Sequence, residues 1–168
     1  KEKIPQYSSN SIIAGAEKAE NYFDIDSISL MEASQALAGE IKLDALLEKI
    51  LTIILKNSGA EYGVLYLQEQ NTLAPKAIMK DGEFTIFNGE SNQSNAIAPK
   101  SIINFVSHLK QAAILDDAGS RGLYVSDPYI IENKSRSVLC APVMHLSKLY
   151  AVIYLENNKM AGAFSDER

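Results

Sequence analysis

The amino-acid sequence predicts an α+β fold in which helices precede a central antiparallel sheet. The first observation is a pair of segments, residues 138–144 and 149–155, that are apolar at odd and even positions alike and flank a short polar turn. A strand with one face in water would alternate, so this hairpin is expected to be covered on both faces. The second observation is that helical periodicity concentrates N-terminal to most strands, an order typical of α+β domains.

Length and charge narrow the class of protein. The chain has 168 residues with 46% hydrophobic content, which predicts one globular domain with a substantial core. Its net charge is -5 and its Lys and Arg residues form no basic stripe, so we expect no nucleic-acid partner. The apolar runs are too short to span a bilayer and the polar start lacks signal-peptide character, so we expect a cytoplasmic protein without membrane insertion. The missing initiator Met favours a fragment.

The N-terminal part is predicted to be a linker followed by two helices. Residues 1–25 are polar and lack a clear period, although residues 12–20 have some helical character. Asp26 suits the N-cap of a helix over residues 27–38, which Gly39 would stop. The next helix has the clearest pattern and ends at Asn57-Ser58-Gly59. Its apolar residues repeat at helical spacing and form one face: Leu43, Leu46, Leu47, Ile50, Leu51 and Ile54.

Three strands follow, over residues 60–68, 73–80 and 83–87. A turn at residues 69–72 and the Asp81-Gly82 pair separate them. Pro75 implies an edge position or an irregular start for the second strand, because proline cannot donate to a ladder. Residues 88–95 form a polar loop.

A helix is expected after Pro99, which suits a first helical turn. Its predicted buried face is Ile102, Ile103, Val106 and Leu109. After a brief strand at 112–115, residues 116–136 are long and irregular, with apolar anchors only at 123–125 and 129–131; loops of this length are more often functional than idle. The apolar hairpin closes the sheet, and Ser165 has the character of an N-cap for a truncated C-terminal helix.

Several short motifs follow one another between residues 26 and 168. They are Leu46-Leu47-Glu48-Lys49-Ile50, Gly59-Ala60, Gly63-Val64-Leu65-Tyr66-Leu67, Ser137-Val138-Leu139, Pro142-Val143, Lys148-Leu149, Ile153-Tyr154-Leu155-Glu156-Asn157-Asn158 and Phe164-Ser165. In this order they resemble a GAF domain. Finer motifs, at residues 33–37, 39–41, 127–129 and 154–158, resemble the GAF module of large bacterial multidomain sensor kinases, which join Ser/Thr-kinase-like, ATPase, GAF and histidine-kinase regions.

The resemblance implies a central antiparallel sheet of five or six strands, with helices on one face and a pocket roofed by loops on the other. It implies a non-catalytic regulatory module that senses a small molecule or transmits a signal within a two-component kinase. A second copy would bind through the flanking helices, and kinase domains of the parent chain would be further partners. The alternative is a purely structural spacer that dimerises and binds no ligand.

Six residues are candidates for lining such a pocket. On the first strand Tyr62, Val64 and Tyr66 share one face, while Leu65 and Leu67 share the other. Ordinary packing of the tyrosines is the competing interpretation, with each hydroxyl reaching water or a partner. The candidate ligand-binding residues are Tyr66, Phe84, Tyr124, Asp127, Tyr129 and Tyr154.

Cofactor chemistry is disfavoured by the few residues able to support it. Cys140 lies in an apolar strand and is expected to be a buried core residue. Bilin-binding relatives carry their cysteine near the position of residues 126–129, which hold none here, and reductase members of the family need several cysteines. Haem would require His108 or His145 in the pocket, but His108 is near a helix end and His145 beside the hairpin turn.

The remaining candidates for functional chemistry are acidic residues. Asp116-Asp117 and Glu156 are predicted to cap loop starts rather than to hold Mg²⁺ or act in acid–base catalysis. Asn158-Lys159, Phe164 and Asp166-Glu167 are similar to the signature of cyclic-nucleotide-binding members, but one residue replaces three between Phe and Asp-Glu. We therefore interpret this segment as a structural tie, and cyclic nucleotides stay open as a ligand class.

Overall fold

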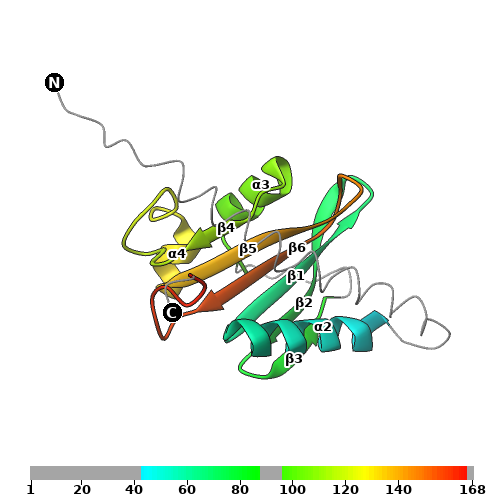
Figure 1. The fold of residues 1–168 in the computed structure, drawn as a ribbon, viewed down its shortest axis with the longest axis horizontal. Coiled ribbons are helices and arrows are strands. Elements are labelled where there is room, and N and C mark those ends of the chain that lie inside the picture. Colours follow the sequence, from blue (N-terminus) through cyan, green and yellow to red (C-terminus); the bar gives the residue numbers. More distant parts are fainter. Residues whose placement is uncertain (1–42, 88–95, 166–168) are drawn as a thin grey trace.

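The computed structural model describes residues 43–87 and 96–165, and its central element is a six-stranded antiparallel sheet (Figure 1). The strand order is β3-β2-β1-β6-β5-β4. The strands are β1 (Tyr62–Glu69), β2 (Thr72–Lys80), β3 (Glu83–Ile86), β4 (Ala113–Leu115), β5 (Ser137–His145) and β6 (Lys148–Asn157). The helices are α2 (Leu43–Ser58), α3 (Lys100–Leu109) and α4 (Pro128–Asn133). The predicted α+β architecture is confirmed.

The sheet is buried on both faces, as the uninterrupted apolar strands predict. On one side, which we call the α2 face, Leu65, Ile153 and Leu155 pack with Leu51 of α2. On the other, the α3–α4 face, α3 and α4 cover a second cluster. Its buried sheet residues are Val64, Tyr66, Ala113, Val138, Cys140, Leu149, Val152 and Tyr154. The predicted division of β1, with Val64 and Tyr66 on one face and Leu65 on the other, is confirmed.

The buried row of α2 begins one turn later than the predicted apolar face. Leu47, Leu51 and Leu55 are buried at i, i+4 and i+8, whereas Leu43 is 55% exposed. Because α2 contacts the sheet along a single row of side chains, the buried face is narrower than the apolar periodicity predicted. The helix ends where predicted: Gly59 has a φ of 73°, and its N–H donates to the carbonyl of Leu55 at 3.0 Å.

Pro75 lies at an irregularity of β2, as predicted. Leu65 pairs with Ala77 and Tyr66 with Pro75, so Lys76 is an extra residue in the ladder. β3 pairs with β2 only from Ala77 onward. The β2–β3 ladder therefore does not need a backbone N–H at Pro75, which proline lacks.

Two expectations for the second half of the chain are wrong. Leu109 was expected in the buried face of α3 but is 56% exposed, because the helix ends there and Lys110 turns away with a φ of 55°. The segment 116–136 is not wholly irregular, since it contains α4. Six residues are too few to produce a recognisable period, but the Asp-Pro pair was a usable start signal. Of the expected anchors Ile130 is buried, while Leu123 is 78% exposed.

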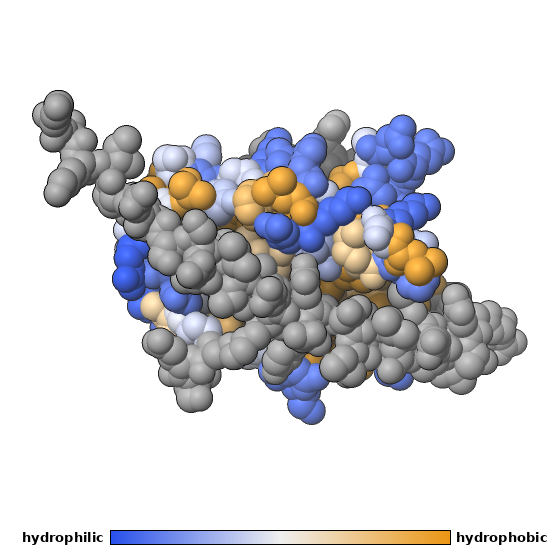
Figure 2. Space-filling view, turned by 45° about the horizontal axis from the view of Figure 1, so that its top comes forward, coloured by the Kyte–Doolittle hydropathy of each residue, from blue (hydrophilic) through white to orange (hydrophobic). Residues whose placement is uncertain are grey.

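The predicted linker at 1–25, the helix at 27–38, the loop at 88–95 and the final residues 166–168 lie outside the described residues. In the described part of the chain, no helix has the length and apolarity needed to cross a bilayer. Figure 2 shows one face of the molecule, on which hydrophobic residues lie scattered among hydrophilic ones.

Candidate functional site

The α3–α4 face, where a pocket was expected, is filled at its centre by side chains of the protein itself. Tyr154 is fully buried and meets two other rings edge-on, Tyr62 at a centroid distance of 6.5 Å and Tyr129 at 6.2 Å. Ile102 of α3 and Ile130 of α4 are likewise fully buried beside them. Packing therefore accounts for much of the tyrosine content of this face.

A polar cluster lies under α4 at the end of β6. The carboxylate of Glu156 is buried, and its Oε2 accepts a hydrogen bond from the Tyr129 hydroxyl at 3.1 Å. Three other buried oxygens have no hydrogen-bond partner among the described residues: Ser135 Oγ, Tyr154 Oη and Glu156 Oε1. Unsatisfied buried polar atoms are uncommon in native structures and call for an explanation.

Burial sets the protonation behaviour of this cluster. It raises the pKa of Glu156 above its ordinary value, while the nearby hydroxyls of Ser135, Tyr154 and Tyr129 and, more weakly, the charge of Lys80 act to lower it. Burial raises the pKa of Tyr62 to about 12 and also raises those of Tyr129 and Tyr154. The phenols are therefore protonated at neutral pH; those of Tyr129 and Tyr154 are available as donors to Glu156, whereas the Tyr62 hydroxyl donates to the carbonyl of Ile97 at 2.6 Å.

Glu156 does not cap a loop start, contrary to the sequence-based expectation. It lies inside β6, one residue before the strand ends, on the same face as Tyr154. The signal that was overlooked is its position in a strand that is apolar on both faces. An acid there must enter a buried layer and find donors.

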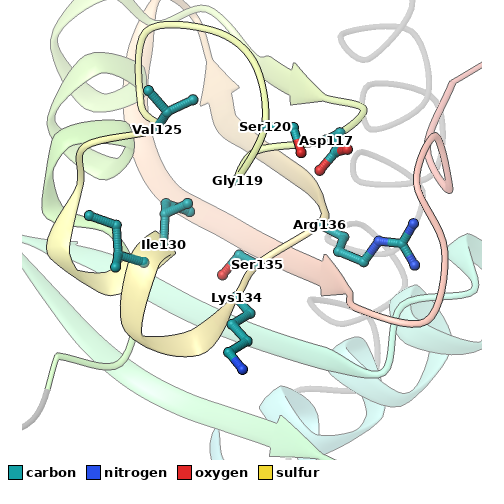
Figure 3. Close-up of a pocket in the computed structure, with 9 residues that line it drawn as sticks. Asp117, Gly119, Ser120, Val125, Ile130, Lys134, Ser135 and Arg136 are labelled. Carbon is teal, nitrogen blue, oxygen red and sulfur yellow. The ribbon is translucent and has the colours of Figure 1, made fainter.

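A hollow of about 510 Å³ opens beside the polar cluster, between the segment 116–127, α4 and residues 134–136, which precede β5 (Figure 3). Its walls include Asp117, Ser120, Val125, Ile130, Lys134 and Ser135. Ser135 belongs both to the hollow and to the Glu156 cluster. The residue is 1% exposed, and its N–H donates to the carbonyl of Ile130 at 3.1 Å, which fixes it just beyond α4.

Asp127 joins the two helices that cover this face. Its Oδ1 accepts the N–H of Tyr129 at 2.9 Å and so caps α4. Its Oδ2 accepts the hydroxyl of Ser101, in the first turn of α3, and the Ser101 N–H at 3.4 Å. The carboxylate therefore has a structural role at the junction of the two helices.

The structure brings together most of the candidate pocket residues on the α3–α4 face but not all six. Tyr66, Tyr129 and Tyr154 are buried in the cluster there, and Tyr124 packs against it, edge-on to Phe105 at 6.2 Å. Phe84 packs on the α2 face, on the other side of the sheet. None of the six lines the hollow in Figure 3, whose walls come from neighbouring positions that carried no apolar period.

The residues considered for cofactor chemistry are placed as follows. Cys140 is a free, fully buried thiol, which confirms the expectation of a core residue. His108 is near the end of α3, with its Nδ1 2.8 Å from the carbonyl oxygen of Asn104. His145 ends β5 beside the turn and is exposed. Within the described ranges, no group of three or more His, Cys, Asp or Glu residues is placed to hold a metal ion.

The end of β6 and the segment after it contact other parts of the structure. Lys159 Nζ lies 2.7 Å from Glu61 Oε2, and this contact lowers the pKa of Glu61. Asn157 Nδ2 donates to the carbonyl of Gly59 at 2.8 Å, and Asn158 Oδ1 accepts the N–H of Arg136 at 2.9 Å. Among the described residues the partner of the lysine is Glu61; Asp166, which belongs to the segment similar to the cyclic-nucleotide signature, lies outside them.

A doubly covered antiparallel sheet with short helices and loops over one face defines a class of small α+β domains. The family model described as GAF domain matches residues 42–168, and the chain belongs to this family. Among solved structures, the GAF domain of an Acinetobacter phosphoenolpyruvate-protein phosphotransferase has a TM-score of 0.54 at 16% identity, covering 84% of this chain and 82% of that one. This likeness shows the fold.

Two curated relatives are histidine kinases. The hybrid signal transduction histidine kinase G of Dictyostelium discoideum is 31% identical over 68 residues, which is 40% of this chain and 2% of the relative. The peroxide stress-activated histidine kinase mak3 of Schizosaccharomyces pombe is 26% identical over 136 residues, 79% of this chain and 6% of the relative. The matched stretch thus spans only a small part of each relative.

Proposed function

We propose that this GAF domain is a regulatory module that senses a small molecule and transmits the signal within a multidomain histidine kinase. The observation that carries the proposal is the hollow between the segment 116–127 and α4, with the buried, unpartnered Ser135 hydroxyl in its wall. A ligand that occupied it would contact α4 directly. Because Tyr129 of α4 is bonded to Glu156 of β6, the ligand would act on the sheet as well.

The kinase context rests on the two histidine-kinase relatives and on the resemblance of finer motifs to bacterial sensor kinases. In this proposal the parent is a cytoplasmic bacterial kinase, and its kinase domains are the partners that receive the signal. The module itself performs no catalysis. A second copy would bind through flanking helices; Ile53, 38% exposed on α2, is suitably placed. A ligand regulates such an assembly only if it binds the two states with different affinity.

The spacer hypothesis is the second candidate, and the filled centre of the α3–α4 face favours it. In that case the domain would hold two copies together through α2, and the hollow would have no ligand. The two functions differ in which surface matters for kinase output.

The experiment compares full-length parent kinase carrying single substitutions. Ser120→Trp fills the hollow from an exposed position, and Asn71→Trp at the exposed β1–β2 turn is the matched control. Sensing predicts that Ser120→Trp changes the autophosphorylation rate severalfold while Asn71→Trp does not. If Ser120→Trp leaves the rate unchanged and Ile53→Asp both abolishes dimers and lowers the rate, the spacer function is correct.

A further inference from the structure

We propose that the hollow binds a small molecule with a primary ammonium group on a short aliphatic body. This inference deepens the proposed sensing function and rests on it. The hydrogen-bond acceptors and apolar carbons in the walls of the hollow indicate the chemistry of the ligand.

The inner wall offers a hydrogen-bond acceptor. Ser135 Oγ is buried and unpartnered among the described residues, and the carboxylate oxygen Oε1 of Glu156, also unpartnered, belongs to the same cluster. A carboxyl oxygen such as Glu156 Oε1 accepts hydrogen bonds. When the Ser135 hydroxyl turns its hydrogen toward Glu156, its lone pairs are left for the hollow, and a ligand donor satisfies them.

The opposite wall of the hollow also carries hydrogen-bond acceptors. Figure 3 shows Asp117 and Ser120 side by side across the hollow from Ser135. The Asp117 carboxylate adds a negative charge, and the Ser120 hydroxyl adds a further acceptor. An ammonium group has three donors on one atom and a charge opposite to that of Asp117, so its chemistry matches the acceptors of both walls.

The cationic residues of the rim are turned away from this space. The guanidinium of Arg136 donates to the carbonyl of Lys159 at 3.0 Å, and Figure 3 shows it and the Lys134 ammonium pointing outward. The charge that faces the hollow is therefore negative. A carboxylate ligand would meet Asp117 instead of a cation, which argues against a simple organic acid.

The remaining walls are aliphatic. Val125, Ile130 and Ile131 line the hollow with branched carbon side chains. A short hydrocarbon body on the ligand would be removed from water against them, at roughly 25 cal/mol per Å² of apolar surface buried. The combination selects an amphipathic ammonium compound over a sugar-like polyol, which has little apolar surface to bury and no charge for Asp117.

Isothermal titration calorimetry on this chain with four matched probes tests the inference. The probes are 3-methylbutylamine, leucine, 3-methylbutanol and 4-methylpentanoate, which separate the ammonium, the amino-acid group, the neutral body and the acid. We expect the amine, leucine or both to bind at least tenfold more tightly than the alcohol and the acid. Binding of the amine alone indicates free amines, and binding of leucine identifies amino acids. Absence of binding by both, or tighter binding of the acid, overturns the inference.

Two variants locate the binding. Asp117→Asn removes the charge and Ser135→Ala removes the inner hydroxyl, and each is expected to weaken binding about tenfold. Asp44→Asn, on the exposed first turn of α2, is the control and should bind normally. Because Asp117→Asn is nearly isosteric, it keeps the test valid if Ser135→Ala is unstable. Unchanged affinity in Asp117→Asn would contradict the site. If no probe binds while Ser120→Trp still alters kinase output, the ligand class is wrong and the sensing function stands.

Discussion

Tyr129 and Glu156 form a buried hydrogen bond, 3.1 Å from phenol oxygen to Oε2, that joins α4 to the end of β6 across 27 residues of sequence. Glu156 is 2% exposed, so its carboxylate depends on protein donors for stabilisation. The same contact connects the wall of the hollow to the central sheet. Its removal therefore tests both the stability of the domain and the connection between α4 and β6.

Tyr129→Phe is predicted to lower the free energy of unfolding by about 1–3 kcal/mol, because it leaves a buried carboxyl oxygen of Glu156 without its hydrogen-bond donor. Urea unfolding followed by circular dichroism measures the change. Tyr150→Phe is the control, since Tyr150 is 38% exposed, and should change stability by about 0.5 kcal/mol or less. Equal effects of the two variants would show that the Tyr129–Glu156 bond does not stabilise the fold.

The raised pKa of Glu156 predicts a pH-dependent stability with a definite sign. Between the ordinary value of 4.5 and the higher value in the fold, the native state binds more protons than the unfolded state. The free energy of unfolding contributed by this group is therefore full below pH 4.5 and falls as the pH rises through the folded pKa. Glu156→Gln removes the titration, so the stability of wild type relative to the variant should decline as the pH rises from 4.5 through the higher pKa of the folded state.

A matched variant gives the opposite slope. The pKa of Glu61 is lowered by its contact with Lys159, so its contribution is present above pH 4.5 and is lost as the pH falls through the folded pKa. Relative to Glu61→Gln, the stability of wild type should therefore rise with pH. Urea unfolding at a series of pH values measures both differences. A constant difference between wild type and Glu156→Gln would mean that Glu156 has the same pKa folded and unfolded.

The sequence was sufficient for the sheet but not for the hollow, and the reason is physical. A strand such as β6 shows its burial in its own composition, and the buried positions of Leu47 and Leu51 follow from helical periodicity, which did not include Leu55. The hollow is built by loop residues such as Asp117 and Ser135, whose positions depend on contacts with distant strands. Glu156 was misassigned because an acid near a strand end is more often a cap than an interior group.

Asp127 is predicted to act structurally, at the junction of α3 and α4. Asp127→Ala should lower the free energy of unfolding by about 1–2 kcal/mol, because the α4 cap and the contact with Ser101 are lost together. Asp127→Asn keeps one acceptor oxygen and should lose less. Chemical denaturation measures both variants. A variant that is as stable as wild type but has altered ligand binding would instead support the role of Asp127 as a ligand-binding residue.

Gly63 is predicted to be required where α2 meets the sheet. A Cβ at this position would lie 2.6 Å from Leu55 Cδ1 and 3.1 Å from Leu155 Cδ2, so Gly63→Ala must displace a buried leucine. We expect a loss of about 1–3 kcal/mol from overpacking, despite the lower backbone entropy of alanine in the unfolded chain. Gly119→Ala is the control, because its Cβ would lie at an ordinary 3.4 Å from the Ser135 carbonyl oxygen.

A double-mutant cycle with Leu55→Ala identifies the cause of that loss. Leu55→Ala alone should cost about 2–5 kcal/mol, because it leaves a cavity against the sheet. In the presence of Gly63→Ala the added methyl occupies part of that cavity and no longer meets Leu55 Cδ1. The cost of the double variant should therefore be smaller than the sum of the single costs by about 1 kcal/mol or more. Additive costs, measured by urea unfolding at one pH, would show that Gly63 is needed for a reason other than the approach of α2.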